Sequence, residues 1–126
     1  MKSVISTEKA PEAIGAYSQA VEIDNFLFLS GQLPMNPING KIIEGNIEEQ
    51  AKQVLENIKA ILEEANVKMN SIVKATVYLN SMDNFAKVNK VYKSYFSGDL
   101  LPARAVVEVS QLPKEVSIEI EIIAHK

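Results

Sequence analysis

The chain has 126 residues, the size of one domain, and 47% of them are hydrophobic, so it is long enough to bury a core. Its net charge of −3 argues against a general basic field that would attract nucleic acid. Without cysteine there is no disulfide, no thiolate metal site and no cysteine nucleophile. The first residues lack the apolar core of a signal peptide, and no run is long enough to cross a bilayer. We therefore expect one cytoplasmic domain over residues 1–126, without a membrane partner.

The first half of the chain is predicted to form two strands and one long helix. The stretch SVIS near the start is typical of a short edge strand, and FLFLSGQ predicts a buried strand that begins at Phe26 and ends near Gly31. Between Asn46 and Asn66, apolar residues recur at the 3.6-residue period of a helix. Asn46 is followed three positions later by Glu49, which predicts a capping box at the start of this helix.

The second half adds a strand, a shorter helix and two final strands. SIVKATVYLN has the two-residue period of a strand. A second helix is predicted over Asp83–Phe96, with Phe85 and Tyr92 in its apolar stripe. The last strands are expected over Ala103–Val109 and Val116–Ala124. This order predicts an α+β fold in which a β-sheet carries both helices on one face.

Arg104 is a fixed cation in the otherwise strand-like run PARAVVEV. If the last two strands form a hairpin, their apolar faces coincide in a register that places Arg104 opposite Glu121 and Val106 opposite Glu119. Arg104 and Glu119 are then diagonal neighbours within reach of each other. The pattern alone favours a solvated cross-strand Arg–Glu pair of little energetic value over a ligand-binding cation.

Two other polar residues depart from the packing pattern. Asn89 interrupts the apolar stripe of the second helix, where a buried amide needs hydrogen-bond partners. A satisfied boundary position and a functional role explain it equally well. Tyr17 lies in the glycine-containing stretch AIGAYSQAV and, taken alone, is more readily explained by packing. The chain has one histidine, no phosphate-binding glycine loop and no metal-ligand cluster, so the familiar catalytic motifs are absent.

Four blocks together resemble the RidA/YjgF family of enamine/imine deaminases. They are AIGAYSQAV, LSGQLPMNP, FAKVNKVYKSYF and PARAVVEVSQLPKEVSIEIEIIA. The resemblance runs in order over essentially the whole chain, and its most specific part is the Pro-Ala-Arg block followed by Leu-Pro and Ile-Glu-Ile. It implies a chorismate-mutase-like fold, a mixed sheet with two helices on one face. It also implies a homotrimer with ligand clefts between subunits.

The resemblance implies roles for two charged residues. Arg104 matches the arginine that holds the substrate carboxylate, for which a guanidinium fork offers two parallel hydrogen bonds. Glu119 matches the acid that positions or activates the hydrolytic water. The implied activity is that of a 2-iminobutanoate/2-iminopropanoate deaminase, a hydrolase converting 2-aminoacrylate and related enamines or imines to 2-keto acids and ammonia. Neither a metal nor an organic cofactor is expected, because an iminium carbon is already electrophilic.

Four further positions match the substrate-binding cleft of the family. Tyr17 matches a tyrosine that lines the cleft, and Asn89 matches an asparagine from the second helix. Gly31 and Val106 match positions whose backbone groups approach the ligand, an approach that the absence of a Cβ at Gly31 would permit. Many relatives carry cysteine where this chain has Val106. Thiol-dependent behaviour is therefore not expected, whereas a backbone role is retained.

Two other functions stay open at this point. A non-catalytic regulatory protein that binds 2-keto acids or related metabolites would use the same Arg104, with signalling as the outcome. A ribonuclease or translation inhibitor, an activity attributed to some similar proteins, is disfavoured by the negative net charge and the single, penultimate histidine.

Overall fold

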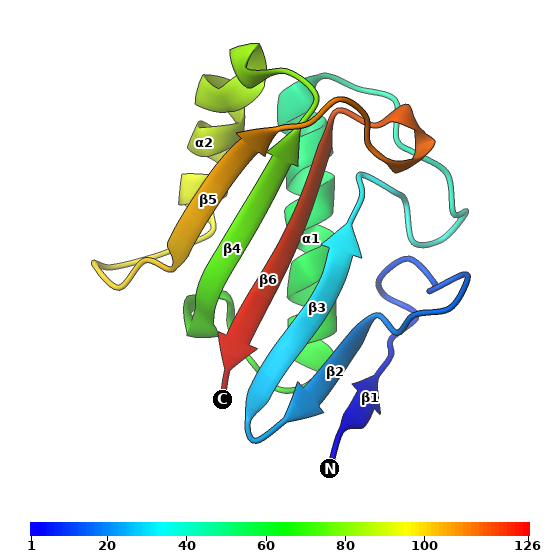
Figure 1. Cartoon of the computed structure of the whole chain (residues 1–126), viewed down its shortest axis with the longest axis vertical. Helices are drawn as coiled ribbons and strands as arrows, with labels where there is room; N and C mark the ends of the chain where they lie inside the picture. The colour runs from blue at the N-terminus through cyan, green and yellow to red at the C-terminus, as the bar shows by residue number, and fades with distance from the viewer.

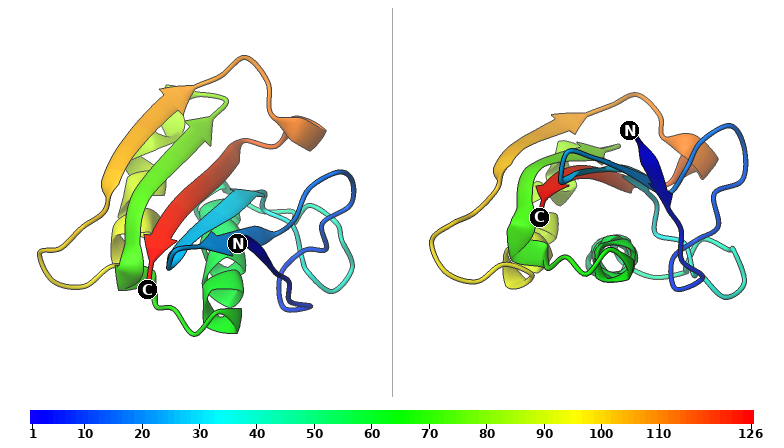
Figure 2. Two further views of the ribbon diagram at one scale, coloured as in Figure 1. Left: turned by 60° about the horizontal axis from the view of Figure 1, so that its bottom comes forward. Right: turned by 90° about the horizontal axis from the view of Figure 1, so that it is seen from below.

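The computed structural model describes all 126 residues and contains a six-stranded sheet with the order β1-β2-β3-β6-β4-β5. β4 and β5 run parallel and all other neighbouring strands run antiparallel. Both helices pack on one face of this mixed sheet and leave the other face open (Figures 1 and 2). The predicted α+β fold is therefore confirmed. The strands are β1 (Ser3–Ile5), β2 (Ala20–Ile23), β3 (Phe26–Gln32), β4 (Ile72–Leu79), β5 (Ala103–Glu108) and β6 (Ile118–His125), and the helices are α1 (Ile47–Glu64) and α2 (Phe85–Ser94).

The hydrophobic core lies between the helices and the inner face of the sheet. Alternate residues of β6, namely Ile118, Ile120 and Ile122, are at most 3% exposed, as the two-residue period of a half-buried strand requires. The charged residues between them point to the open face. No helix is both long and apolar enough to cross a membrane.

The capping box predicted for α1 is present. The Asn46 side chain accepts a hydrogen bond from the Glu49 backbone N–H at 2.9 Å, and the Glu49 carboxylate accepts from the Asn46 backbone N–H at 3.5 Å. These bonds satisfy two of the amide groups that a helix start leaves without partners. At the other end, Asn66 adopts a φ of 58° and the chain leaves the helix. The sequence therefore located this helix to within two residues at each end.

Asn57 is a buried polar residue of α1 that the helical pattern did not single out. Its side chain is 1% exposed. The amide nitrogen donates to the carbonyls of Leu33 and Met35 at 3.2 and 3.0 Å, and the amide oxygen accepts from Gln53 at 2.9 Å. Asn57 thereby ties the segment that leaves β3 to the middle of the helix.

Asn57→Ala is expected to lower the free energy of unfolding by about 1–3 kcal/mol, because it leaves two carbonyls without their donor. Urea unfolding at a fixed protein concentration measures the change. Lys59→Ala, an exposed change on the same helix, is the matched control and should alter the stability by no more than about 0.5 kcal/mol. Equal effects of the two substitutions would contradict the anchoring role.

The predicted hairpin between the last two strands is wrong. β4 lies between them, pairing Ala75 with Arg104 on β5 and Thr76 with Glu121 on β6. Residues 109–117 cross the end of β4. Both ends of this connection are hydrogen bonded to β4 or the residue after it, from the Val109 N–H to the Leu79 carbonyl and from the Asn80 N–H to the Ser117 carbonyl.

The arrangement has a physical reason. β4, α2 and β5 form a crossover unit, which places two parallel strands side by side. β6 has a fully buried inner face and takes a central position, whereas the more exposed β5 forms the edge. A two-residue apolar period tells which face a residue occupies but not which strand lies next to it.

The corrected order separates Arg104 from Glu119. Paired residues of neighbouring strands point to the same face, so Arg104 shares the helix side of the sheet with the buried Ala75. Glu119 pairs with Tyr78 and shares the open face with it. Within one chain, the two charged residues of the predicted site therefore lie on opposite faces of the sheet.

Candidate functional site

Arg104 projects from the edge strand β5 toward α2, where neutral groups hold it. Its Nη1 donates to Asn89 Oδ1 at 2.7 Å. The guanidinium carbon lies 4.8 Å from the ring centroid of Tyr92 and 5.6 Å from that of Phe85, within cation–π range. No carboxylate lies within 4.0 Å of it. Arg104 is thus an oriented, exposed and unneutralised cation, and the predicted cross-strand Arg–Glu pair is wrong.

Phe85 and Tyr92 belong to this half of the site, although their spacing predicted only core packing. With Asn89 they occupy positions four and three residues apart, which places all three on one face of α2. Tyr92 is 6% exposed, and burial raises the pKa of its phenol while the charge of Arg104 opposes the rise. The helical spacing of two aromatic residues around an asparagine was the available signal.

Val106 lies two residues beyond Arg104 on the same strand. It pairs with Val77, is partly buried and packs its side chain against the core. Because β5 is the edge of the sheet, alternate backbone groups along it have no partner strand. A backbone contact to a ligand near Val106 stays a prediction.

Glu119 and Gly31 meet on the open face. The register of β3 against β6 shifts between Leu29 and Gln32, and the half-buried Glu119 carboxyl group lies against Gly31 there. A Cβ built on Gly31 would be 2.8 Å from Glu119 Cδ, so the Glu119 side chain would have to move to accommodate it. Glycine at this position therefore makes room for the carboxylate, a reason different from the ligand approach that the resemblance implied.

The surroundings of Glu119 raise the pH at which its carboxyl group releases its proton. Burial raises the pKa of its carboxyl group, and the nearby charge of Glu121 raises it further. Glu121 in turn accepts a hydrogen bond from the Tyr78 hydroxyl at 2.5 Å. A half-buried acid whose pKa is raised toward neutrality is suited to proton transfer.

The raised pKa makes ionised Glu119 a local destabilising group. In the unfolded chain the carboxyl group has its ordinary pKa of 4.5, and the folded protein releases the proton at a higher pH. Below pH 4.5 the group is protonated in both states and costs no stability. As the pH rises through the raised pKa, the charged carboxylate increasingly destabilises the fold. Glu119→Gln is thus expected to raise the stability at pH 8 by up to about 1 kcal/mol, a limit that allows for solvent screening. It should change nothing at pH 3.5. Thermal unfolding at both pH values, with the exposed Glu63→Gln as control, checks this.

Tyr17 lies on the loop before β2 and is 55% exposed. It lines a hollow together with Ser18, Phe28 and Ser30. The Ser30 hydroxyl donates to the Ser18 carbonyl at 2.6 Å, which ties this loop to β3 directly before Gly31. Tyr17, Gly31 and Glu119 are thus presented in one region, and Arg104, Asn89 and Val106 in another.

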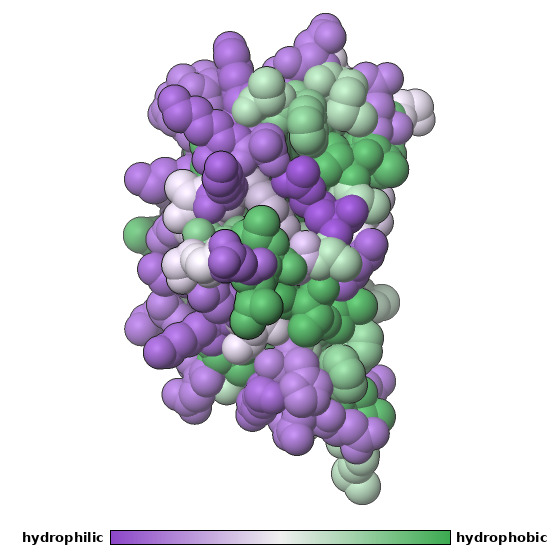
Figure 3. All heavy atoms as spheres, turned by 90° about the vertical axis from the view of Figure 1, so that its left-hand side faces the viewer, coloured by the Kyte–Doolittle hydropathy of each residue, from purple (hydrophilic) through white to green (hydrophobic).

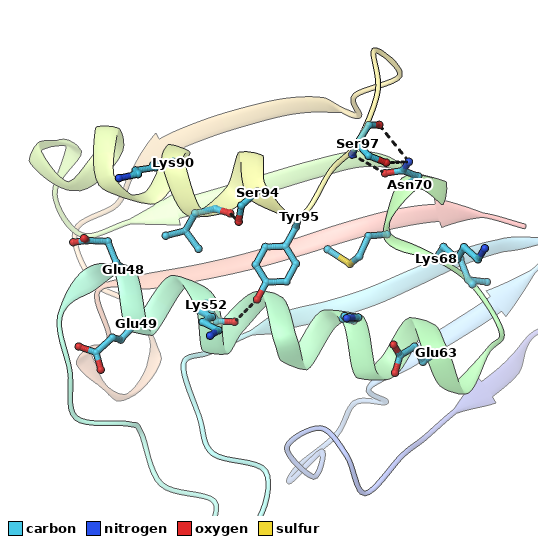
Figure 4. Close-up of a pocket in the computed structure, with 14 residues that line it drawn as sticks. Glu48, Glu49, Lys52, Glu63, Lys68, Asn70, Lys90, Ser94, Tyr95 and Ser97 are labelled. Carbon is cyan, nitrogen blue, oxygen red and sulfur yellow. Dashed lines mark hydrogen bonds between the residues drawn. The ribbon is translucent and has the colours of Figure 1, made fainter.

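A larger hollow than the one beside Tyr17 lies elsewhere. It lies between α1 and α2, half of its lining residues are charged, and Tyr95 bridges the helices (Figure 4). The Tyr95 hydroxyl donates to the Lys52 carbonyl at 3.4 Å and to the Glu56 carboxylate at 2.5 Å. None of the predicted site residues lines this groove. We do not assign it to the reaction.

Comparisons with known proteins agree with the fold. Residues 7–126 match the model of a family described as endoribonuclease L-PSP. A RutC family protein of Pyrococcus abyssi is 58% identical over 125 residues, 99% of this chain and 98% of the relative. A Mus musculus protein named 2-iminobutanoate/2-iminopropanoate deaminase is 48% identical over 124 residues, 98% of this chain and 91% of the relative. The structure of E. coli TdcF with bound serine matches with a TM-score of 0.92 and 40% identity, covering 98% of each chain.

Proposed function

Because the chain belongs to the endoribonuclease L-PSP family, that of the RidA/YjgF proteins, we propose that it is a cofactor-independent 2-iminobutanoate/2-iminopropanoate deaminase. Its substrates would be reactive enamines or imines of 2-keto acids, such as 2-aminoacrylate. The observation that carries the proposal is Arg104, an exposed guanidinium held by two aromatic rings and an amide with no carboxylate to neutralise it. Such a group suits the carboxylate that all these substrates share.

The site we propose is shared between two copies of the chain. Arg104 and Glu119 lie on opposite faces of the sheet, so a ligand can touch both only if the Arg104 side of one copy meets the open face of another. The open face exposes the apolar side chains of Phe28 at 42% and Val107 at 39%, and the segment leading to Arg104 exposes Leu101 at 58%. Figure 3, viewed onto the side of α2 and β5, shows hydrophobic residues gathered among hydrophilic ones. A closed homotrimer would bury both surfaces in repeated interfaces.

In the proposed reaction, Arg104 binds the substrate carboxylate and fixes the position of the imine carbon. The oxygen of a water molecule bonds to that carbon while Glu119 accepts one of the water's protons and passes it to the nitrogen, which gives a carbinolamine. The hydroxyl proton then moves to the nitrogen, the C–N bond breaks and ammonia leaves with the electron pair. One imine and one water thus yield one 2-keto acid and one ammonia. Tyr17 and backbone groups near Gly31 would bound the pocket.

A coupled assay tests this proposal. A serine/threonine dehydratase generates 2-aminoacrylate or its methyl homologue in place, and keto-acid formation is followed with and without the protein. Acceleration above the spontaneous rate supports the deaminase. No acceleration with either substrate, together with Arg104-dependent binding of pyruvate or 2-oxobutanoate, would favour a metabolite-binding regulatory protein instead, a reading to which the serine-bound relative also lends support.

The description of the family raises ribonuclease activity as a second candidate. The net charge of −3 offers little attraction for an RNA backbone. Cleavage of a labelled single-stranded RNA by the purified protein, at a rate that Arg104→Ala leaves unchanged, would support this candidate.

A further inference from the structure

Two glutamates and a tyrosine form a cluster on the open face. Glu119 and Glu121 are two residues apart on β6, and on the neighbouring strand β4 Tyr78 is the paired residue of Glu119. The Tyr78 hydroxyl nevertheless donates to Glu121 Oε1 at 2.5 Å and not to its direct cross-strand partner. Neither carboxylate is in an ion pair. Two like charges therefore share a small, half-buried surface with one hydrogen-bond donor.

The donor makes the two carboxylates unequal. The hydrogen bond to Glu121 is the largest cause that raises the pKa of Tyr78 to about 12, so the phenol stays protonated and remains a donor throughout the physiological range. A donor held in this way favours the ionised form of the carboxylate that accepts from it. Glu119 has no such donor and lies against Gly31. Burial and the nearby charge of Glu121 therefore raise the pKa of Glu119 with no donor to oppose them.

The lysines on the open face form no ion pair with Glu119 or Glu121. Lys74 of β4 lines a small hollow together with Glu121. Lys2 lines the hollow beside Tyr17 and Ser30. Neither lysine is within 4.0 Å of a carboxylate oxygen.

We propose that Tyr78 is a positioning residue: by donating its hydrogen bond to Glu121 and not to Glu119, it makes Glu119 the member of the pair that takes up and releases the proton of the reaction. This inference rests on the proposed function, since it concerns the same acid. It adds two residues, Tyr78 and Glu121, that act through Glu119 without touching the substrate.

The titration of Glu119 tests the inference without any activity measurement. The carboxyl carbon of Glu119 in labelled protein is identified by its absence from Glu119→Gln, and its chemical shift is followed against pH in the assembled protein. Tyr78→Phe is expected to move the midpoint to lower pH, and Glu121→Gln to move it further in the same direction. Combining both substitutions should add nothing to Glu121→Gln, because Tyr78 acts only through Glu121.

Tyr95→Phe is the matched control. The Tyr95 hydroxyl also donates to a glutamate, Glu56, at 2.5 Å, but on the helix side of the molecule. Its removal should leave both the Glu119 midpoint and the activity unchanged. A midpoint that Tyr78→Phe does not move, or additive shifts in the double variant, would overturn the inference.

Kinetic measurements distinguish a failure of this inference from a failure of the proposed deaminase function. In Tyr78→Phe, the limb of the kcat–pH profile that reports Glu119 should follow the NMR midpoint, with kcat at neutral pH reduced roughly three- to tenfold and KM unchanged. An inactive wild type would overturn the deaminase and the catalytic use of the proton. The titration alone would still decide whether Tyr78 sets the protonation of Glu119.

Discussion

Arg104→Ala is expected to reduce kcat/KM for imine hydrolysis roughly 30- to 1000-fold, the loss that follows when one partner of a desolvated, hydrogen-bonded charge pair is removed. The substrate carboxylate would have no fixed cation to orient it, so the imine carbon would no longer be held next to the water. The dehydratase-coupled assay measures this loss. Arg104 is exposed, so thermal unfolding should show a folded variant that loses no more than about 2 kcal/mol, the worth of its hydrogen bond to Asn89 and its contacts with two rings.

Arg104→Lys distinguishes geometry from charge. Lysine keeps the positive charge but loses the planar fork and the stacking on Tyr92 and Phe85. We expect a clear loss of activity in this variant too, with KM rising more than kcat falls. An Arg104→Ala variant that hydrolyses 2-aminoacrylate at the wild-type rate would refute the anchoring role.

The sequence predicted the helices and strands themselves better than it predicted which strands lie side by side. The capping box of Asn46 and Glu49 and the alternating burial along β6 depend on residues close together in the chain, and both are confirmed. The neighbour of β5 depends on the crossover through α2 and on which strand buries the most surface. The two-residue period of apolar residues reveals neither the crossover nor the relative burial of the strands. The hairpin prediction failed for that reason.

The sequence named candidate site residues but did not show how they are arranged. The apolar stripe of α2 contains Phe85 and Tyr92 as predicted, yet only the structure shows that their rings hold Arg104. The ligand approach expected at Gly31 stays a prediction, and the structure adds that the missing Cβ leaves room for the Glu119 side chain. Contacts between residues distant in the chain decide both facts, and a single sequence does not state them.

A mixture of two inactive variants is expected to regain activity. Arg104→Ala removes one half of the proposed site and Glu119→Gln the other, and the two residues lie on opposite faces of the sheet. If subunits assort at random after the variants are co-expressed in equal amounts, roughly a quarter of the interfaces combine an intact Arg104 with an intact Glu119. The mixed protein should recover about that fraction of the wild-type kcat per site, with the wild-type KM, in the coupled assay.

The controls for this mixture make the result specific to a site between copies. Native mass spectrometry must show assemblies that contain both variants, because unexchanged subunits cannot complement each other. The double variant Arg104→Ala/Glu119→Gln, co-expressed with either single variant, should recover nothing, since no interface then contains both intact residues. Mixed assemblies without activity would mean that Arg104 and Glu119 do not serve one site. Arg104 would then bind its ligand without help from the open face, as a metabolite-binding protein requires.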